Sequence, residues 1–188
     1  MPKTTANKLT IIRVVMIPVF LAILYWGFDG SRYVALGVFI LASLTDLLDG
    51  YIARHYNQIS DFGKFMDPLA DKCLVMAALC WFVEEGTMAG WVLAVVLLRE
   101  FAVSGMRLVA VEKGRVIAAG WSGKIKTAVT MAGICLMLFL NTSIFADLLG
   151  VCFIQILNWI IVALISVTTL YSGVEYFLKN FDVLVEKK

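Results

Sequence analysis

Residues 46–71 read DLLDGYIARHYNQISDFGKFMDPLAD, and this stretch decides the fold. Four of its five aspartates form two pairs, Asp46 with Asp49 and Asp67 with Asp71, and an apolar run lies on the outer side of each pair. Spacings of three and four residues place both members of a pair on one face of a helix. Two consecutive helices joined by the short stretch between the pairs run antiparallel, so the pairs can face each other at one depth.

The composition of the whole chain predicts that this stretch lies in a membrane protein. Of the 188 residues, 61% are hydrophobic and only 16% are charged, and the mean hydropathy is +0.89. A soluble domain has about 45–50% apolar and about 25% charged residues, and a globule of this length cannot hide so much apolar surface from water. The composition therefore excludes a soluble enzyme, a disordered chain and a secreted disulfide scaffold. The net charge of +2 is too small to indicate a nucleic-acid partner.

Six segments are apolar enough to cross a bilayer, which takes about 20 residues each. We expect these spans at residues 9–28, 33–53, 64–83, 89–111, 123–141 and 151–178. Since a backbone in lipid must satisfy its own hydrogen bonds, each span is predicted to be a helix. No connection is long enough for a second domain, so residues 1–188 are interpreted as one membrane domain. The expected fold is all-α, with six transmembrane helices around a polar cavity open to the cytoplasm.

Basic residues alternate between the two ends of these spans. They gather at both chain termini and around the second and fourth connections, whereas Arg32 is the one basic residue in the other connections. Cytoplasmic connections carry the excess of lysine and arginine. The alternation therefore predicts that both termini and both Asp pairs lie on the cytoplasmic side of a multi-pass membrane protein.

Four carboxylates at one depth of a membrane repel each other unless something neutralises them. An ionisable residue within a span costs at least a few kcal/mol. Two divalent cations would supply the neutralisation, and hard oxygen ligands suit Mg²⁺ or Mn²⁺. The alternative is that a pair caps a helix or forms an ion pair with Arg54 or Lys72. That alternative explains one pair but not all four aspartates.

The residues between the two pairs have properties that suit a phosphate-containing ligand. Gly50 allows close approach to the backbone, Ala53 leaves room on the same helix face as Asp49, and Gly63 permits a sharp entry into the next helix. Arg54 offers a planar, permanently charged fork for phosphate. Taken singly, each small residue is more often a packing residue, and only the spacing of the whole set favours a functional role.

The whole set resembles the signature of the CDP-alcohol phosphatidyltransferases. All eight defining positions match, and they are Asp46, Asp49, Gly50, Ala53, Arg54, Gly63, Asp67 and Asp71. The six-span layout also fits this family. Flanking stretches at residues 7–13, 62–72, 99–107 and 123–127 resemble the bacterial members that make phosphatidylglycerophosphate.

The resemblance implies a reaction, a set of site residues and a location. CDP-diacylglycerol and sn-glycerol 3-phosphate would give phosphatidylglycerophosphate and CMP, at the bacterial inner membrane and in a homodimer surrounded by membrane lipids. The four aspartates would hold two metal ions, and Asp71 would also be the general base for the acceptor hydroxyl. The residues expected to line the CDP site are Asn7, Thr10, Gly50, Ala53, Arg54, Ser60 and Gly63.

The acceptor carries a phosphate, so its binding site should be basic. The candidates are Arg99, Arg107, Lys124 and Lys126. Arg99 lies about two turns into its span, deeper than snorkelling of the side chain explains. The alternative for Arg99 is an ion pair with its neighbour Glu100. Arg107, Lys124 and Lys126 are equally consistent with markers of the cytoplasmic side or with contacts to lipid headgroups.

Other functions remain open at this stage. The same signature serves acceptors such as inositol phosphate or phosphatidylglycerol, whereas the basic residues disfavour serine and choline. A membrane prenyltransferase also uses two Asp clusters, but it usually has more spans and places its clusters on well-separated helices. A cation channel or carrier would use the aspartates as an ion site, but transport does not require the glycines, alanine and arginine at fixed spacing.

Overall fold

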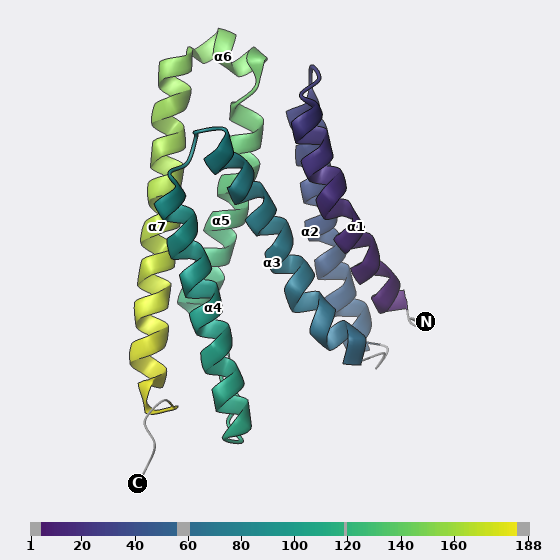
Figure 1. Ribbon diagram of the computed structural model, residues 1–188, viewed down its shortest axis with the longest axis vertical. Coiled ribbons are helices and arrows are strands. Elements are labelled where there is room, and N and C mark those ends of the chain that lie inside the picture. The colour runs from purple at the N-terminus through teal and green to yellow at the C-terminus, as the bar shows by residue number, and fades with distance from the viewer. Residues whose placement is uncertain (1–4, 56–60, 119, 184–188) are drawn as a thin grey trace. The chain divides into compact units, whose positions relative to one another are not determined.

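The computed structural model describes residues 5–55, 61–118 and 120–183, and it describes no side chains for residues 5–10, 46–55, 61–65, 67, 68 and 71. The described chain is helical and contains no strand (Figure 1). The long helices are α1 (Thr5–Trp26), α2 (Ser31–His55), α3 (Asp61–Glu84), α4 (Gly90–Glu112), α5 (Trp121–Leu140) and α7 (Val151–Asn180). They coincide in order with the six predicted spans, so the prediction of an all-α chain is confirmed.

Two short helices were not predicted. Helix α6 (Ser143–Leu149) connects α5 to α7, and the 3₁₀ turn η1 (Phe181–Val183) follows α7. Residues 143–149 form an apolar run that is far too short to cross a membrane, and the left-handed Gly150 (φ +81°) separates it from α7. Phe145 of α6 packs on Phe139 of α5, with ring centroids 4.7 Å apart.

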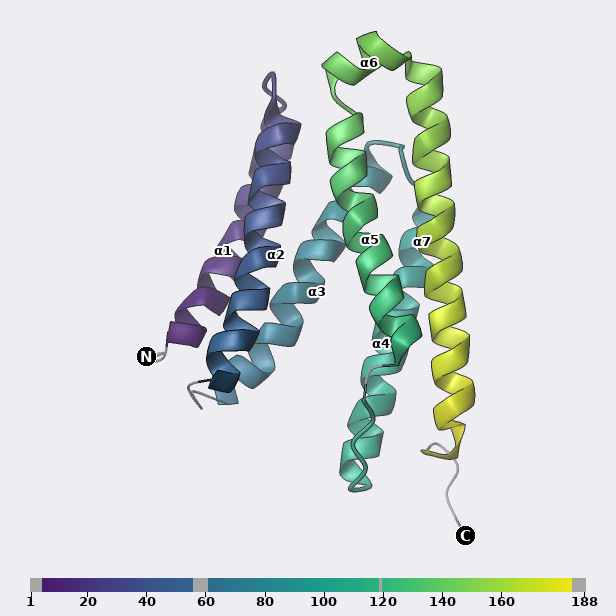
Figure 2. The same cartoon turned by 180° about the vertical axis from the view of Figure 1, so that it is seen from behind.

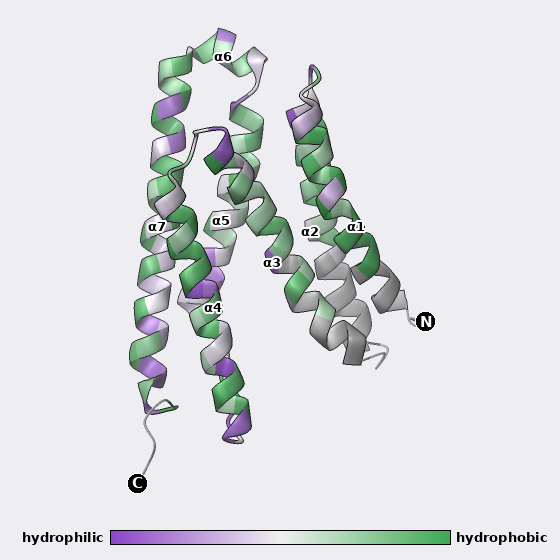
Figure 3. Cartoon of the chain, in the orientation of Figure 1, coloured by the Kyte–Doolittle hydropathy of each residue, from purple (hydrophilic) through white to green (hydrophobic). Residues whose placement is uncertain are grey.

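Two helical segments of the described chain are long and apolar enough to cross a membrane. They are Trp121–Leu140 and Val151–Val183, and shorter apolar stretches occupy Ile11–Trp26 and Ser31–Thr45. Apolar residues occur along most of the length of α4 and α7 (Figure 3). Large side chains there are widely exposed, with 71% for Phe101 and 64% for Val167. Such a surface suits lipid rather than water.

The chain divides into two compact units. Unit 1 comprises residues 1–81 and 134–154, and unit 2 comprises residues 82–133 and 155–188. In unit 1, α1 and α2 pack side by side, as Figures 1 and 2 both show. Phe20 of α1 meets Phe39 of α2 with ring centroids 6.0 Å apart, and the small residues Ala35 and Ala42 are fully buried on α2. The tight turn between these two helices uses Gly27 and Gly30 at φ values of +63° and +89°.

Unit 2 packs α4 against the first part of α5 and most of α7. One face of α4 buries apolar residues at helical spacing, namely Val92, Val96, Val103, Met106 and Ala110. Helices α5 and α7 lie close together at Gly133, where an added Cβ would lie 2.9 Å from Cγ2 of Ile161 and 3.0 Å from Cδ1 of Ile165. The interior of this unit also contains polar side chains, and two of these residues, Lys126 and Ser172, belong to the candidate site.

Candidate active site

The two Asp pairs lie at matching positions on consecutive helices. Asp49 lies six residues before the end of α2, and Asp67 lies six residues after the start of α3. Figures 1 and 2 both show the end of α2 beside the start of α3. A rise of about 1.5 Å per residue puts both positions roughly 9 Å from the joined ends. The convergence of Asp46, Asp49, Asp67 and Asp71 stays a prediction, because their side chains lie outside the described residues.

The start of α1 reaches the same level as this part of α2. Asn7 lies nineteen residues before the end of α1, and Gly50 lies nineteen residues after the start of α2. The two helices are antiparallel and joined by a tight turn. Residues that are equally many positions from the turn therefore lie at the same level along the helix axes. Asn7 and Thr10 are therefore level with the last three turns of α2, where Ala53 also lies.

The remaining side chains predicted to line the CDP site cannot be compared with the structure. Gly63 lies in the first turn of α3, and Arg54 lies at the end of α2. Ser60 and the side chains of Asn7, Thr10, Ala53 and Arg54 lie outside the described residues. The CDP site therefore stays a prediction.

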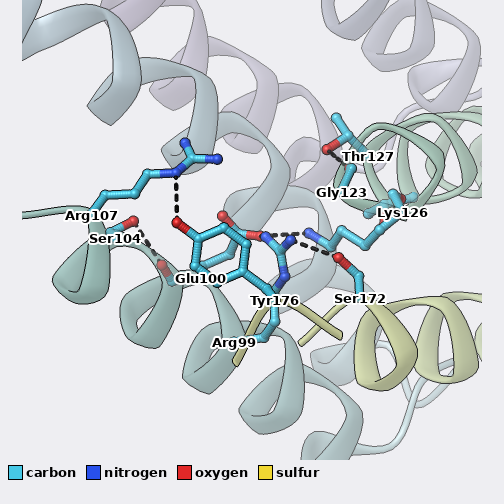
Figure 4. Close-up of polar contacts among 10 residues, drawn as sticks. Arg99, Glu100, Ser104, Arg107, Gly123, Lys126, Thr127, Ser172 and Tyr176 are labelled. Atoms are coloured by element: carbon cyan, nitrogen blue, oxygen red, sulfur yellow. Dashed lines mark hydrogen bonds and ion pairs between the residues drawn. The ribbon is translucent and has the colours of Figure 1, made fainter. Parts of the chain in front are cut away.

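In unit 2, a polar cluster is formed by Arg99 and Glu100 of α4, Lys126 of α5 and Ser172 of α7 (Figure 4). Arg99 Nη1 and Lys126 Nζ each donate to Glu100 Oε1 at 2.8 Å, and Arg99 Nη2 donates to Ser172 Oγ at 2.8 Å. Only 5% of the Lys126 side chain and 13% of the Arg99 side chain are exposed. The two cations share one carboxylate, which leaves one positive charge in excess.

Glycines leave room for the Arg99 side chain. A Cβ on Gly123 would lie 3.4 Å from Arg99 Nη2, and a Cβ on Gly173 would lie 3.3 Å from Arg99 Cγ. The Nε atom of Arg99 is buried and has no hydrogen-bond partner among the described residues. A buried donor of this kind costs free energy unless a ligand or water satisfies it. The guanidinium is thus held through its Nη1 and Nη2 atoms and retains Nε as an unused donor.

The structure separates the four cations predicted to bind the acceptor phosphate. Arg99 and Lys126 meet at Glu100, so the alternative of an Arg99–Glu100 ion pair is present. Arg107 donates from Nε to Tyr176 Oη at 3.3 Å, and its guanidinium lies 5.7 Å from the centre of that ring. The Lys124 ammonium lies 5.0 Å from the centre of the Trp121 ring. The described contacts of Arg107 and Lys124 are therefore to aromatic residues and not to the polar cluster.

Sequence reasoning missed the contribution of α7 to this cluster. Thr169, Ser172 and Tyr176 are buried in unit 2 and are spaced by three and four residues, which places them on one face of α7. That spacing was a readable signal. A polar stripe in an otherwise apolar span points toward the protein interior rather than toward lipid.

Comparison with known proteins assigns the family. The model of the CDP-alcohol phosphatidyltransferase family matches residues 3–174, and the chain therefore belongs to this family. A CDP-diacylglycerol–glycerol-3-phosphate 3-phosphatidyltransferase of Bacillus subtilis is 40% identical over 190 residues, which cover 95% of each chain.

Two further relatives have the same name as the Bacillus subtilis protein. The protein of Rickettsia typhi is 33% identical over 176 residues, or 93% of this chain and 96% of its own length. The protein of Salmonella paratyphi A is 33% identical over 173 residues, or 89% of this chain and 90% of its own length. The resemblance read from residues 46–71 is thus confirmed.

Proposed function

We propose that this chain transfers the phosphatidyl group of CDP-diacylglycerol to sn-glycerol 3-phosphate, giving phosphatidylglycerophosphate and CMP in phospholipid biosynthesis. The observation that carries the proposal is the placement of the two Asp pairs at matching positions on α2 and α3 in a member of this family. The names of relatives matched over most of their length support the choice of glycerol 3-phosphate as acceptor.

The family uses divalent cations, and the donor set of this chain fits them. Asp46, Asp49, Asp67 and Asp71 would hold two Mg²⁺ or Mn²⁺ ions, because carboxylate oxygens are the ligands these ions prefer. When bound, such a metal pair neutralises the diphosphate and the charge that develops on the leaving CMP. The metals also remove the cost of four like charges at one depth of a membrane.

The chain's own residues would activate and orient the two substrates. Asp71 takes the proton of the acceptor hydroxyl, whose oxygen then forms a bond to the phosphorus of the phosphatidyl group while the bond from that phosphorus to CMP breaks. The residues that would line the CDP site are Asn7, Thr10, Gly50, Ala53, Arg54, Ser60 and Gly63. Arg54 would contribute a fixed positive charge, and the small residues would leave space for the diphosphate.

The polar cluster is the proposed site for the phosphate of the acceptor. Arg99 and Lys126 are held by Glu100, have one positive charge in excess and include the unused Arg99 Nε donor. Charge-assisted hydrogen bonds to phosphate are the strongest of their kind. Arg107 and Lys124 belong to the same predicted set, and we place them in a secondary role because their described contacts are with Tyr176 and Trp121.

The membrane arrangement is part of the proposal. All six long helices would cross the bacterial inner membrane around a polar cavity open to the cytoplasm, with both termini and the Asp pairs on the cytoplasmic side. The alternation of basic residues along the chain supports this orientation. Membership of the family supports a homodimer in contact with membrane lipids.

Substitution of Asp71 tests the chemical step. We expect Asp71→Asn to abolish CMP release from CDP-diacylglycerol and glycerol 3-phosphate, because an amide cannot accept the hydroxyl proton. The thermal unfolding midpoint of the purified protein in detergent should stay close to that of the wild type. Retention of CMP release by the folded variant would remove Asp71 as the base.

A further inference from the structure

A pocket of about 450 Å³ lies in unit 1 at the turn between α1 and α2. We call it the turn pocket. Its size is within the range of roughly 300–1,000 Å³ that is typical of small-ligand sites. Its wall combines residues from the α1–α2 turn, the last part of α3 and the α5–α6 junction, and all of them belong to unit 1.

Contacts between side chains hold the wall of the turn pocket in place. The hydroxyls of Tyr33 and Thr142 are hydrogen-bonded at 3.0 Å, which joins the start of α2 to the α5–α6 junction. Tyr25 and Trp81 meet edge to face with ring centroids 5.0 Å apart, which joins the end of α1 to α3. A pocket between such contacts is preformed, as ligand sites usually are.

The position of the turn pocket along the helices places it at the opposite membrane surface from the Asp pairs. Asp49 lies eighteen residues after Ser31, the first residue of α2. At about 1.5 Å per residue this is roughly 27 Å, close to the thickness of about 30 Å of a hydrocarbon core. Trp26, which is 82% exposed, and the exposed Tyr25 and Phe28 lie at this end. Aromatic residues of this kind mark the headgroup level of a bilayer.

The chemistry of the wall matches a lipid headgroup of zero net charge. Tyr25, Phe28 and Trp81 form an apolar side, while hydroxyl and amide side chains form a polar side. The lining includes one cation, Arg32, and one anion, Asp29. The indole Nε1 of Trp81 is a buried donor without a hydrogen-bond partner in the described part of the chain, and an ester or phosphate oxygen would satisfy it.

We propose that the turn pocket binds the headgroup of a zwitterionic aminophospholipid from the leaflet opposite the Asp pairs. The phosphate lies toward Arg32, which is in the first turn of α2. The ammonium lies toward Asp29. The site is separate from the residues of the proposed reaction, and it depends on the proposed membrane topology but not on the acceptor or the base.

Native mass spectrometry of the purified full-length protein in detergent tests this site. The probes are phosphatidylethanolamine, phosphatidylglycerol and diacylglycerol with identical acyl chains. We expect phosphatidylethanolamine to bind roughly tenfold more tightly than diacylglycerol, as a charge-assisted hydrogen bond to the phosphate predicts. Phosphatidylglycerol should bind more weakly than phosphatidylethanolamine, because Asp29 repels an anionic lipid.

Variants of the turn pocket distinguish specific headgroup binding from nonspecific binding of lipid to the protein surface. Arg32→Gln should lose the preference for phosphatidylethanolamine over diacylglycerol, and the exposed Asp29→Asn should lose the preference over phosphatidylglycerol. Arg115→Gln is the matched control, because it removes an exposed arginine of unit 2, and it should keep both preferences. All three variants should retain CMP release. Equal binding of the three lipids by the wild type, or unchanged preferences in both pocket variants, would overturn the proposal.

Discussion

Lys124 and Lys126 lie two residues apart on α5 but have different surroundings. Substituting each of them distinguishes a structural role from a substrate-binding role. Lys126 is buried and donates to Glu100 at 2.8 Å, whereas Lys124 is exposed and lies over the Trp121 ring. Both lysines belong to the set that the sequence assigned to the acceptor phosphate. The structure predicts that their replacement by methionine, which keeps most of the side-chain length, has different consequences.

The magnitude follows from the contact that would be lost. A hydrogen bond to a charged group contributes about 1.5–3 kcal/mol. Each 1.4 kcal/mol corresponds to a factor of about ten, so Lys126→Met should lower kcat/KM for glycerol 3-phosphate by roughly 10- to 150-fold. Lys124→Met removes an exposed contact with an aromatic ring worth about 0.5–1 kcal/mol. We expect its kcat/KM to stay within about twofold of the wild type, since that contact involves no substrate.

The assay is CMP release by purified protein in mixed micelles, with each substrate varied in turn. Loss of a phosphate contact should raise KM for glycerol 3-phosphate and leave KM for CDP-diacylglycerol unchanged. Lys126→Arg keeps the charge and should recover part of the lost affinity. A merely structural role for Lys126 would instead lower kcat and the unfolding midpoint with both KM values unchanged.

Two results would refute the reasoning. The first is a folded Lys126→Met protein whose KM for glycerol 3-phosphate equals that of the wild type. The second is an equal effect of Lys124→Met and Lys126→Met, which would mean that burial beside Glu100 does not distinguish the two lysines. Either result would remove the polar cluster as the acceptor site and leave the assignment of the Asp pairs untouched.

Three further predictions concern packing, metal and surface charge. Gly133→Leu should lower the free energy of unfolding by about 1–3 kcal/mol, because the new side chain collides with α7. Gly105→Leu is the control, because its side chain enters open space and should not lower the stability. Equal midpoints of the two variants on unfolding in detergent would contradict the close packing of α5 on α7. Chelation with EDTA should abolish CMP release and added Mg²⁺ or Mn²⁺ should restore it, so activity that persists in EDTA would contradict the metal assignment. Asp182→Asn breaks an ion pair with Arg115 in which the side chains are 59% and 58% exposed, so the unfolding midpoint should stay close to that of the wild type. A clear drop in the midpoint would indicate a structural role for this pair.

Much of the fold was readable because lipid imposes simple rules. Apolar runs of fixed length must be helices, and the predicted spans coincide with α1 to α5 and α7. Helix α6 was not predicted, because seven residues are too few to be recognised as a membrane span. Its packing on Phe139 depends on tertiary structure. Whether α1 to α4 cross the membrane stays a prediction, since only α5 and the Val151–Val183 segment are long and apolar enough by themselves among the described residues.

The candidate site likewise has a part that the sequence predicts and a part that only the structure shows. The positions of the Asp pairs along α2 and α3 were predictable, because helical periodicity and chain order alone determine them. The grouping of Arg99 with Lys126 was not predictable, because it depends on how α4, α5 and α7 pack. The spacing of Ser172 and Tyr176 on α7 was available in the sequence, but only the structure gives these residues their partners.

The central claim is the transfer of a phosphatidyl group to glycerol 3-phosphate. The most direct measurement supplies the purified protein with CDP-diacylglycerol and, separately, with radiolabelled glycerol 3-phosphate, inositol phosphate or phosphatidylglycerol, and follows both CMP and labelled lipid. We predict release of CMP and formation of labelled phosphatidylglycerophosphate with glycerol 3-phosphate alone. Labelled lipid formed from inositol phosphate or phosphatidylglycerol, with none from glycerol 3-phosphate, would contradict the account.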